Sequence, residues 1–180
     1  MRSAILVLSV ATLTCPAVAL AKVTADPAFF TEATAGIVCV SGVSTSEAAP
    51  GTRLGYIDTV RGEIVMGLAA DRIPAIPGLS FGVISQVADT AGAAGVTMIV
   101  THPPMGPEGS TRDTWQRDFF GGNPNASFFQ FDFPEELVTG DWTMQAVLGD
   151  RVLLFSRFQV VDPGAMPGFV NPCREPPPIS

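Results

Sequence analysis

Apolar and polar residues alternate in short runs along most of the chain. Seven such runs, rich in β-branched and aromatic residues, are separated by Gly, Pro and Asp: residues 37–40, 63–68, 79–88, 95–100, 128–133, 142–147 and 152–161. A period of two residues is typical of strands that bury one face. Only residues 25–34 resemble a helical turn. The pattern therefore predicts an all-β sandwich of antiparallel strands.

The last two runs form the clearest local unit. They are joined by Gly149-Asp150, and a glycine in the first of two turn positions suits a type II′ hairpin. Alternation predicts that each strand of this hairpin buries one face in the core. The residues expected on those faces are Trp142, Met144, Ala146, Phe158 and Val160.

The first 21 residues have the three parts of a secretory signal peptide. A positive charge at Arg2 precedes the uncharged run 4–13, and Ala19-Leu20-Ala21 ends the segment on small residues. The apolar run is too short to span a bilayer, and no later segment is long enough without a charge or a proline. We therefore expect cleavage near Ala21, no transmembrane segment, and a periplasmic or secreted protein.

Proline content marks the other end of the predicted domain. Six of the last 18 residues are proline, which is typical of an extended tail. The predicted organisation is a signal peptide at 1–21, an N-terminal segment at 22–34, a β-sandwich domain at 35–162 and a Pro-rich C-terminal tail at 163–180.

The charge balance limits the classes of partner. The chain has 17 acidic and 10 basic residues, a formal net charge of −7. Loss of Arg2 with the signal peptide makes the charge one unit more negative. Because no basic cluster exists, nucleic acid is excluded as a partner, which leaves an unknown protein or small molecule.

Removing the signal peptide also changes the cysteine count. Cys15 is lost, and Cys39 and Cys173 remain. An even pair in an oxidising compartment favours a disulfide, with two free thiols as the alternative. A bond that encloses nearly the whole domain is worth about 5 kcal/mol in the chain-entropy model.

One segment matches the motif of a serine nucleophile. Gly78-Leu79-Ser80-Phe81-Gly82 fits G-x-S-x-G, in which a sharp strand-to-helix turn exposes the serine. Here a strand is predicted to follow, and the chain has a single histidine, His102, as a possible base. A chance match is the favoured interpretation, and a small serine hydrolase using Ser80 and His102 stays as an alternative.

The same histidine raises the question of a metal. Met98, His102 and Met105 carry thioether and imidazole groups that suit Cu(I). With one histidine there is no paired-histidine zinc site. The favoured interpretation is a strand-end histidine hydrogen-bonded to a loop, and no cofactor is predicted. A periplasmic copper-handling protein using His102 and Met remains an alternative function.

Long irregular loops are expected at 103–115 and 121–126, and binding residues concentrate on such loops. The acidic residues near the end of the Phe-rich run are expected to be a solvated loop. The candidates for contact with a ligand are His102, Arg112, Trp115 and Arg117, and the acidic residues are Asp132, Glu135, Glu136 and Asp141.

Several short motifs follow one another in a distinctive order. They are Asp71-Arg72-Ile73-Pro74-Ala75, Gly78, Phe81-Gly82, His102-Pro103, Trp115, Glu136-Leu137, Gly140-Asp141-Trp142 and Phe158-Gln159-Val160. In this order, over about residues 35–162, the chain resembles the bacterial domain-of-unknown-function family thirty-eight fifty-nine. The resemblance implies a sandwich fold and a bacterial source, and it implies no activity. The Pro-rich tail and the cysteine pair depart from the family pattern.

These observations together predict an antiparallel immunoglobulin-like β-sandwich of about seven or eight strands. The predicted function is an exported non-catalytic binding or accessory protein of unknown ligand, and not an enzyme, because the residues form no complete catalytic constellation.

Overall fold

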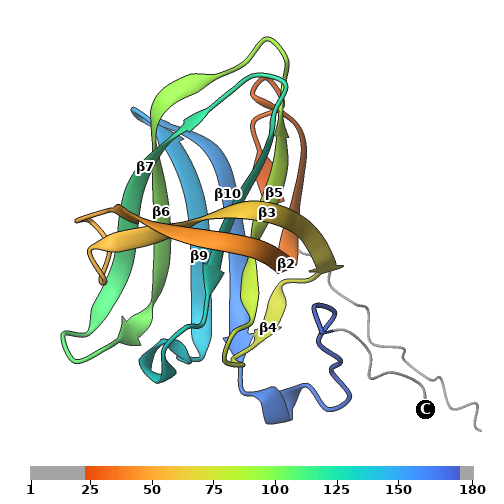
Figure 1. Cartoon of the computed structure of the whole chain (residues 1–180), viewed down its shortest axis with the longest axis vertical. Helices are drawn as coiled ribbons and strands as arrows, with labels where there is room; N and C mark the ends of the chain where they lie inside the picture. The colour runs from red at the N-terminus through yellow and green to blue at the C-terminus, as the bar shows by residue number, and fades with distance from the viewer. Residues whose placement is uncertain (1–22, 175–180) are drawn as a thin grey trace, which may run out of the picture.

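The computed structural model describes residues 23–174 (Figure 1). The predicted signal peptide and the last six residues of the predicted tail lie outside the described residues. Ten strands and two short 3₁₀ helices make up the rest: β1 (Val23–Ala25), β2 (Phe30–Ala48), β3 (Tyr56–Ala69), β4 (Arg72–Pro74), β5 (Ser80–Val87), β6 (Ala93–Met105), β7 (Ser110–Phe119), β8 (Pro124–Gln130), η1 (Pro134–Glu136), β9 (Gly140–Leu148), β10 (Arg151–Val161) and η2 (Pro163–Ala165).

The strands form two packed sheets. One has the order β1-β10-β9-β6-β7, with β4 added in parallel beside β10, and the other has the order β3-β2-β5-β8. The series β10-β9-β6-β7 facing β2-β5-β8 has the connectivity of strands G-F-C-C′ facing A-B-E in an immunoglobulin domain. The prediction of an all-β, antiparallel immunoglobulin-like sandwich is confirmed, with ten strands in place of seven or eight.

The core between the sheets is built around Trp142, which is fully buried on β9. Its indole packs edge-on against Phe81 at 5.4 Å between ring centroids and against Phe129 at 4.9 Å. The final hairpin is as predicted, with Gly149 at φ +57° and no positive φ at Asp150. The five side chains expected on its inner faces are all buried: Trp142, Met144, Ala146, Phe158 and Val160.

Two local predictions are wrong and one holds only in part. Within residues 25–34, the N–H groups of Phe29 and Phe30 donate to the carbonyl oxygen of Asp26 in a single turn, and the neighbouring residues belong to the end of β1 and the start of β2. The segment 103–115 is mostly strand rather than loop, since β6 continues to Met105 and β7 begins at Ser110. Likewise β8 begins at Pro124, within the second predicted loop. Strand β7 was not predicted, because Asp113 and Arg117 occupy positions on its inward face, where apolar residues normally reveal a strand.

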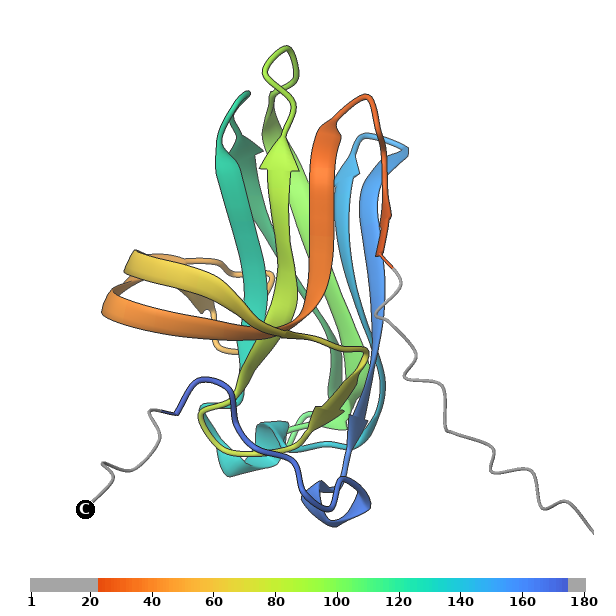
Figure 2. The same ribbon diagram turned by 90° about the vertical axis from the view of Figure 1, so that its right-hand side faces the viewer.

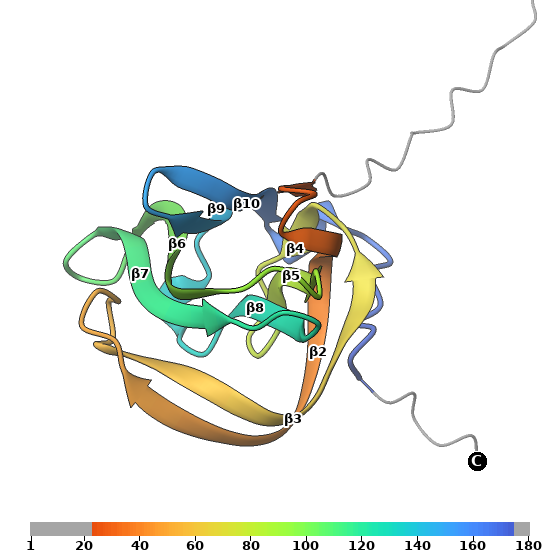
Figure 3. The same ribbon diagram turned by 90° about the horizontal axis from the view of Figure 1, so that it is seen from above.

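The most unusual element is the hairpin of β2 and β3. β2 pairs with β5 only as far as Val38, but it pairs with β3 as far as Ala48. Beyond residue 38 the two strands therefore leave the sandwich as a two-stranded arm, residues 39–65, which projects from the body (Figure 2). Seen from above, the arm curves back towards β7 (Figure 3).

Two glycines face each other where the arm curves. Gly42 on β2 pairs with Gly62 on β3, and Gly42 has φ +134°. A Cβ on Gly62 would lie 1.9 Å from the carbonyl oxygen of Ser41. Glycine in a strand interior permits such a close approach and a tight bend, so this pair lets the arm bend across the open side of the sandwich.

Candidate functional site

The turn of the arm is fastened to β7. The backbone N–H of Thr114 donates to the carbonyl oxygen of Gly51 at 2.9 Å, and the N–H of Arg53 donates to Asp113 Oδ1 at 2.5 Å. A Cβ on Gly51 would lie 2.5 Å from Thr114 Oγ1, so this approach requires glycine. The arm is thus held at both ends: at its root β2 pairs with β5, and at its tip the turn is hydrogen-bonded to β7.

The side chain of Arg53 adds a second connection. Its Nη2 lies 2.5 Å from Glu136 Oε1, and its Nη1 lies 3.5 Å from Glu135 Oε1. Glu136 is 3% exposed, and its other oxygen accepts the N–H groups of Asp132 and Phe133. The expectation of a solvated acidic loop is therefore wrong for Glu136, which is a buried anchor of the arm.

Asp113 connects the arm to the interior through His102. The two residues meet at 3.2 Å between His102 Nε2 and Asp113 Oδ2, while His102 Nδ1 lies 2.9 Å from the carbonyl oxygen of Pro103. Both partners of the ring are acceptors, so only the protonated imidazole donates both hydrogen bonds. His102 lies against Trp142, 5.0 Å between ring centroids. The histidine thus holds Asp113 from the core side, while the other oxygen of Asp113 accepts the N–H of Arg53 on the arm.

Lowering the pH is expected to weaken this anchor. Burial works to raise the pKa of the Asp113 carboxyl, but hydrogen bonds from His102 and from the N–H of Arg53 outweigh it and hold the pKa below its usual 3.8. A carboxyl whose pKa is lower in the folded than in the unfolded state adds stability above 3.8. That contribution is lost as the pH falls through the folded-state pKa.

Asp113→Asn is therefore expected to lower the free energy of unfolding by about 1.5–3 kcal/mol at about pH 7 and by less at about pH 3. Urea denaturation at the two pH values measures both losses. Asp150→Asn, in the exposed turn between β9 and β10, is the matched control and is expected to change neither value. A loss of equal size at both pH values would contradict a role for the ionised carboxylate.

A cavity of about 740 Å³ lies between the arm and the strands β7 and β8. Its arm side includes Leu54, Ile57 and Val60, and its sandwich side includes Trp115 and Phe128. Pockets that bind small molecules typically measure about 300–1,000 Å³ and carry a mostly apolar lining with a few polar groups. The cavity therefore has the size of a ligand site, and its lining mixes these apolar side chains with six carboxylates and two arginines.

The polar group of most interest in this cavity is Arg117. Its Nη1 donates to the carbonyl oxygen of Ala126 at 2.7 Å and to Ser127 Oγ at 2.9 Å, which bridges β7 to β8. The guanidinium also lies over the ring of Phe119, 5.5 Å from its centroid. Burial lowers the pKa of Arg117 from its usual value. It is a partly desolvated cation in the cavity wall.

The structure separates the four predicted ligand-contact residues. Trp115 and Arg117 both line the cavity, from a strand rather than the predicted loop. Arg112 is exposed, and its even position on β7 places it on the opposite face of the strand. His102 is buried behind Asp113. Arg53, which was not predicted from the sequence, holds the arm in place. It lies in a polar turn and its partners are distant in sequence, so no local motif identifies it.

The proposed copper ligands occupy structural positions. Met98 and Met105 are buried in the hydrophobic core, and both ring nitrogens of His102 have hydrogen-bond partners. A copper ion on either nitrogen would displace one of these partners. Among residues 23–174, no group of three or more His, Cys, Asp and Glu side chains is placed to hold a metal ion.

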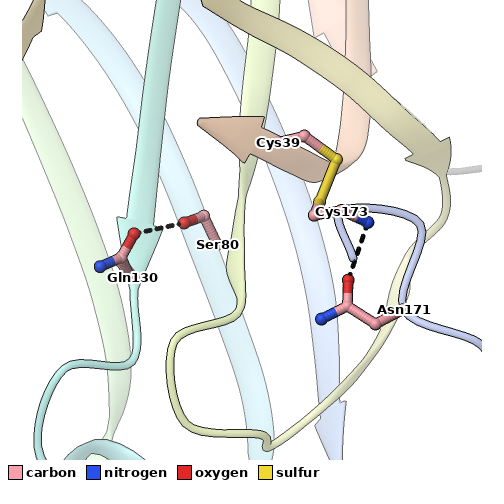
Figure 4. Close-up of a disulfide and its surroundings, with 5 residues drawn as sticks. All are labelled: Cys39, Ser80, Gln130, Asn171 and Cys173. Carbon is pink, nitrogen blue, oxygen red and sulfur yellow. Dashed lines mark hydrogen bonds between the residues drawn. A yellow bond between two sulfur atoms is a disulfide. The ribbon is translucent and has the colours of Figure 1, made fainter. Parts of the chain in front are cut away.

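Ser80 is also structural. It is 4% exposed at the start of β5, and its hydroxyl donates to Gln130 Oε1 on β8 at 2.8 Å (Figure 4). His102 lies on the other sheet with partners of its own. The two side chains therefore form no nucleophile–base pair, and a strand rather than a helix follows the G-x-S-x-G segment.

The predicted disulfide is present between Cys39 and Cys173, with an S–S length of 2.06 Å (Figure 4). It joins the root of the arm to the C-terminal tail. In the tail, the N–H of Cys173 donates a hydrogen bond to Asn171 Oδ1.

None of the helices in the described part of the chain is long and apolar enough to cross a membrane.

Fold and site together define an immunoglobulin-like β-sandwich with an arm that forms one wall of a ligand-sized cavity. The model of the family "Domain of unknown function (DUF3859)" matches residues 28–160, and the chain belongs to this family. The resemblance stated from the sequence is thereby confirmed. No curated protein matches the chain. Among solved structures, the chain is similar to an immunoglobulin-like protein from Pseudomonas aeruginosa, with 22% identity, coverage of 69% of this chain and 96% of that chain, and a TM-score of 0.47.

Proposed function

We propose that this protein is an exported, non-catalytic binding or accessory protein, and that its ligand occupies the cavity under the arm. The observation that carries the proposal is the cavity itself, about 740 Å³ with a lining that mixes apolar side chains with charged ones. Its size is that of small-molecule sites. The ligand is proposed as a small molecule rather than a protein because the arm covers one side of the space and narrows the access to it.

The structure of the arm supports this proposal. All residues from 41 to 48 are exposed, so the arm buries little apolar surface of its own. An isolated two-stranded hairpin is marginally stable in water. Here it is held by a few polar anchors at Gly51 and Arg53. Elements of low local stability are those from which binding loops and lids are drawn, so an arm of this kind suits ligand entry.

The proposed location rests on the cysteines and the N-terminal sequence. A disulfide that spans 134 residues persists in oxidising compartments and is rare in the cytosol. This agrees with the signal-peptide pattern of residues 1–21. The non-catalytic assignment is supported by Ser80 and His102, whose polar atoms are engaged in hydrogen bonds that stabilise the fold.

Ala126→Trp is expected to fill the cavity and weaken ligand binding. Ala126 lines the cavity on β8, and a tryptophan there would occupy space now open to a ligand. The neutral fluorescent probe N-phenyl-1-naphthylamine measures this directly, with saturable binding to the wild-type protein and an affinity about tenfold lower for the variant, a difference of about 1.4 kcal/mol.

Ala165→Trp is the matched control for this experiment. Ala165 is exposed on η2 and lies outside the cavity, so the probe should bind this variant as it binds the wild type. Equal weakening by both substitutions, or no saturable binding to the wild-type protein, would overturn the proposed function. Thermal unfolding of each variant shows whether the fold is retained.

A further inference from the structure

Arg117 has unused capacity to bind an anion. None of the four ion pairs among the described residues involves its guanidinium. Its two hydrogen bonds, to Ala126 and Ser127, both use Nη1. The only fully buried side-chain atom without a partner in the described part of the chain is Ser156 Oγ, so the remaining N–H groups of Arg117, a residue of the cavity wall, are accessible. A guanidinium with free N–H groups is a strong receptor for a carboxylate or another anion.

Among the described residues, none of the six carboxylates that line the cavity forms an ion pair with Arg117. Asp113 is held by His102 and the N–H of Arg53, and Glu136 by the Arg53 side chain. The other four are exposed, where solvent screens their charge, and they accept hydrogen bonds from neutral donors: Asp118, Asp132, Asp58 and Glu47. Arg117 is therefore the cation of the wall that lacks an internal counter-ion.

Part of the cavity wall suits an apolar body. Leu54 on the arm is 39% exposed and Phe120 after β7 is 65% exposed, and both line the cavity together with Trp115. Large apolar side chains that stay exposed in a concave site are typical of a surface that a ligand covers. Their burial by an apolar ligand would be favourable at about 25 cal/mol per Å².

We propose that the ligand of this cavity is an amphiphilic monoanion, such as a long-chain carboxylate. Its charged group pairs with the free N–H groups of Arg117, and its apolar body lies between the arm and β8. The inference rests on the proposed function, because it assigns a ligand class to the same cavity. It adds the requirement for one negative charge, which the cavity volume alone does not impose.

Two fluorescent probes with the same aromatic body test the charge requirement. 1-Anilinonaphthalene-8-sulfonate carries a sulfonate, and N-phenyl-1-naphthylamine lacks it. Arg117→Met is expected to lower the affinity for the sulfonate probe about tenfold or more and to leave the neutral probe within about threefold. Arg112→Met, on the opposite face of β7, removes the same charge from the protein and is expected to change neither affinity.

Competition on the wild-type protein makes the test independent of any variant's folding. Dodecanoate is expected to displace the neutral probe at a concentration about tenfold lower than 1-dodecanol does. Equal potency of the acid and the alcohol, or equal effects of Arg117→Met and Arg112→Met, would overturn the inference while leaving a neutral-ligand site intact. Failure of every probe to bind the wild type would overturn the proposed function as well.

Discussion

Trp142→Ala is expected to lower the free energy of unfolding by about 3–5 kcal/mol, which corresponds to about 10 °C in Tm for a domain of this size. Trp142 is fully buried and touches Phe81 and Phe129 of the opposite sheet. Its indole N–H donates to the carbonyl oxygen of Val138 at 3.2 Å. The substitution leaves a large cavity and an unpaired carbonyl, and close-packed surroundings collapse into such a space only in part. Urea denaturation followed by circular dichroism measures the loss.

The chain contains its own control for this experiment. Trp115 is the second tryptophan, half-buried where β7 lines the cavity. Trp115→Ala removes the same atoms from a partly hydrated site, so the expected loss is about half as large or less. If Trp142→Ala fails to fold, Trp142→Phe keeps most of the packing and gives a measurable intermediate value. Equal losses for the two alanine variants would contradict the central role of Trp142.

Much of the fold was predictable from the sequence because burial leaves a pattern. The hairpin of β9 and β10 alternates apolar and polar residues, and its turn has the glycine that a type II′ geometry needs. Trp142 and Phe158 therefore signalled the core, and the number of cysteines signalled the disulfide. These predictions succeeded because a local pattern, such as alternation or a turn glycine, agreed with the composition of the whole chain.

The cavity was not predictable for the opposite reason. The strand β7 presents Asp113 and Arg117 inward, so it lacks the apolar alternation that identifies a strand. On the β2 side of the arm, residues 41–48 are all exposed, so they lack the alternation of buried apolar residues that identifies a strand. Its position depends on pairs such as Arg53 with Glu136, which are 83 residues apart and have no sequence motif. Long-range polar contacts of this kind require the structure.

The disulfide is expected to contribute as much stability as the central tryptophan, through a different mechanism. Replacing both Cys39 and Cys173 by alanine should lower the free energy of unfolding by about 3–5 kcal/mol, because the bond restricts the unfolded chain over a separation of 134 residues. The free energy of the folded state changes less than that of the unfolded state. Cys39 is only half-buried and Cys173 is exposed, so few core contacts are lost. Gly67 lies beneath the bond, where a Cβ would come within 2.5 Å of Cys39 Sγ.

This mechanism makes a second, separable prediction about the denatured state. Without the cross-link the unfolded chain exposes more surface, so the slope m of the free energy against urea concentration should rise in the double variant. Trp142→Ala should leave m unchanged, because it acts on the folded core. Reductant added to the wild type should reproduce both the lower stability and the steeper slope, and should have no effect on the double variant. A wild type whose intact mass does not rise by two hydrogen atoms on reduction would refute the bond itself, and a lower stability with unchanged m would place its contribution in the packing of the tail over Gly67.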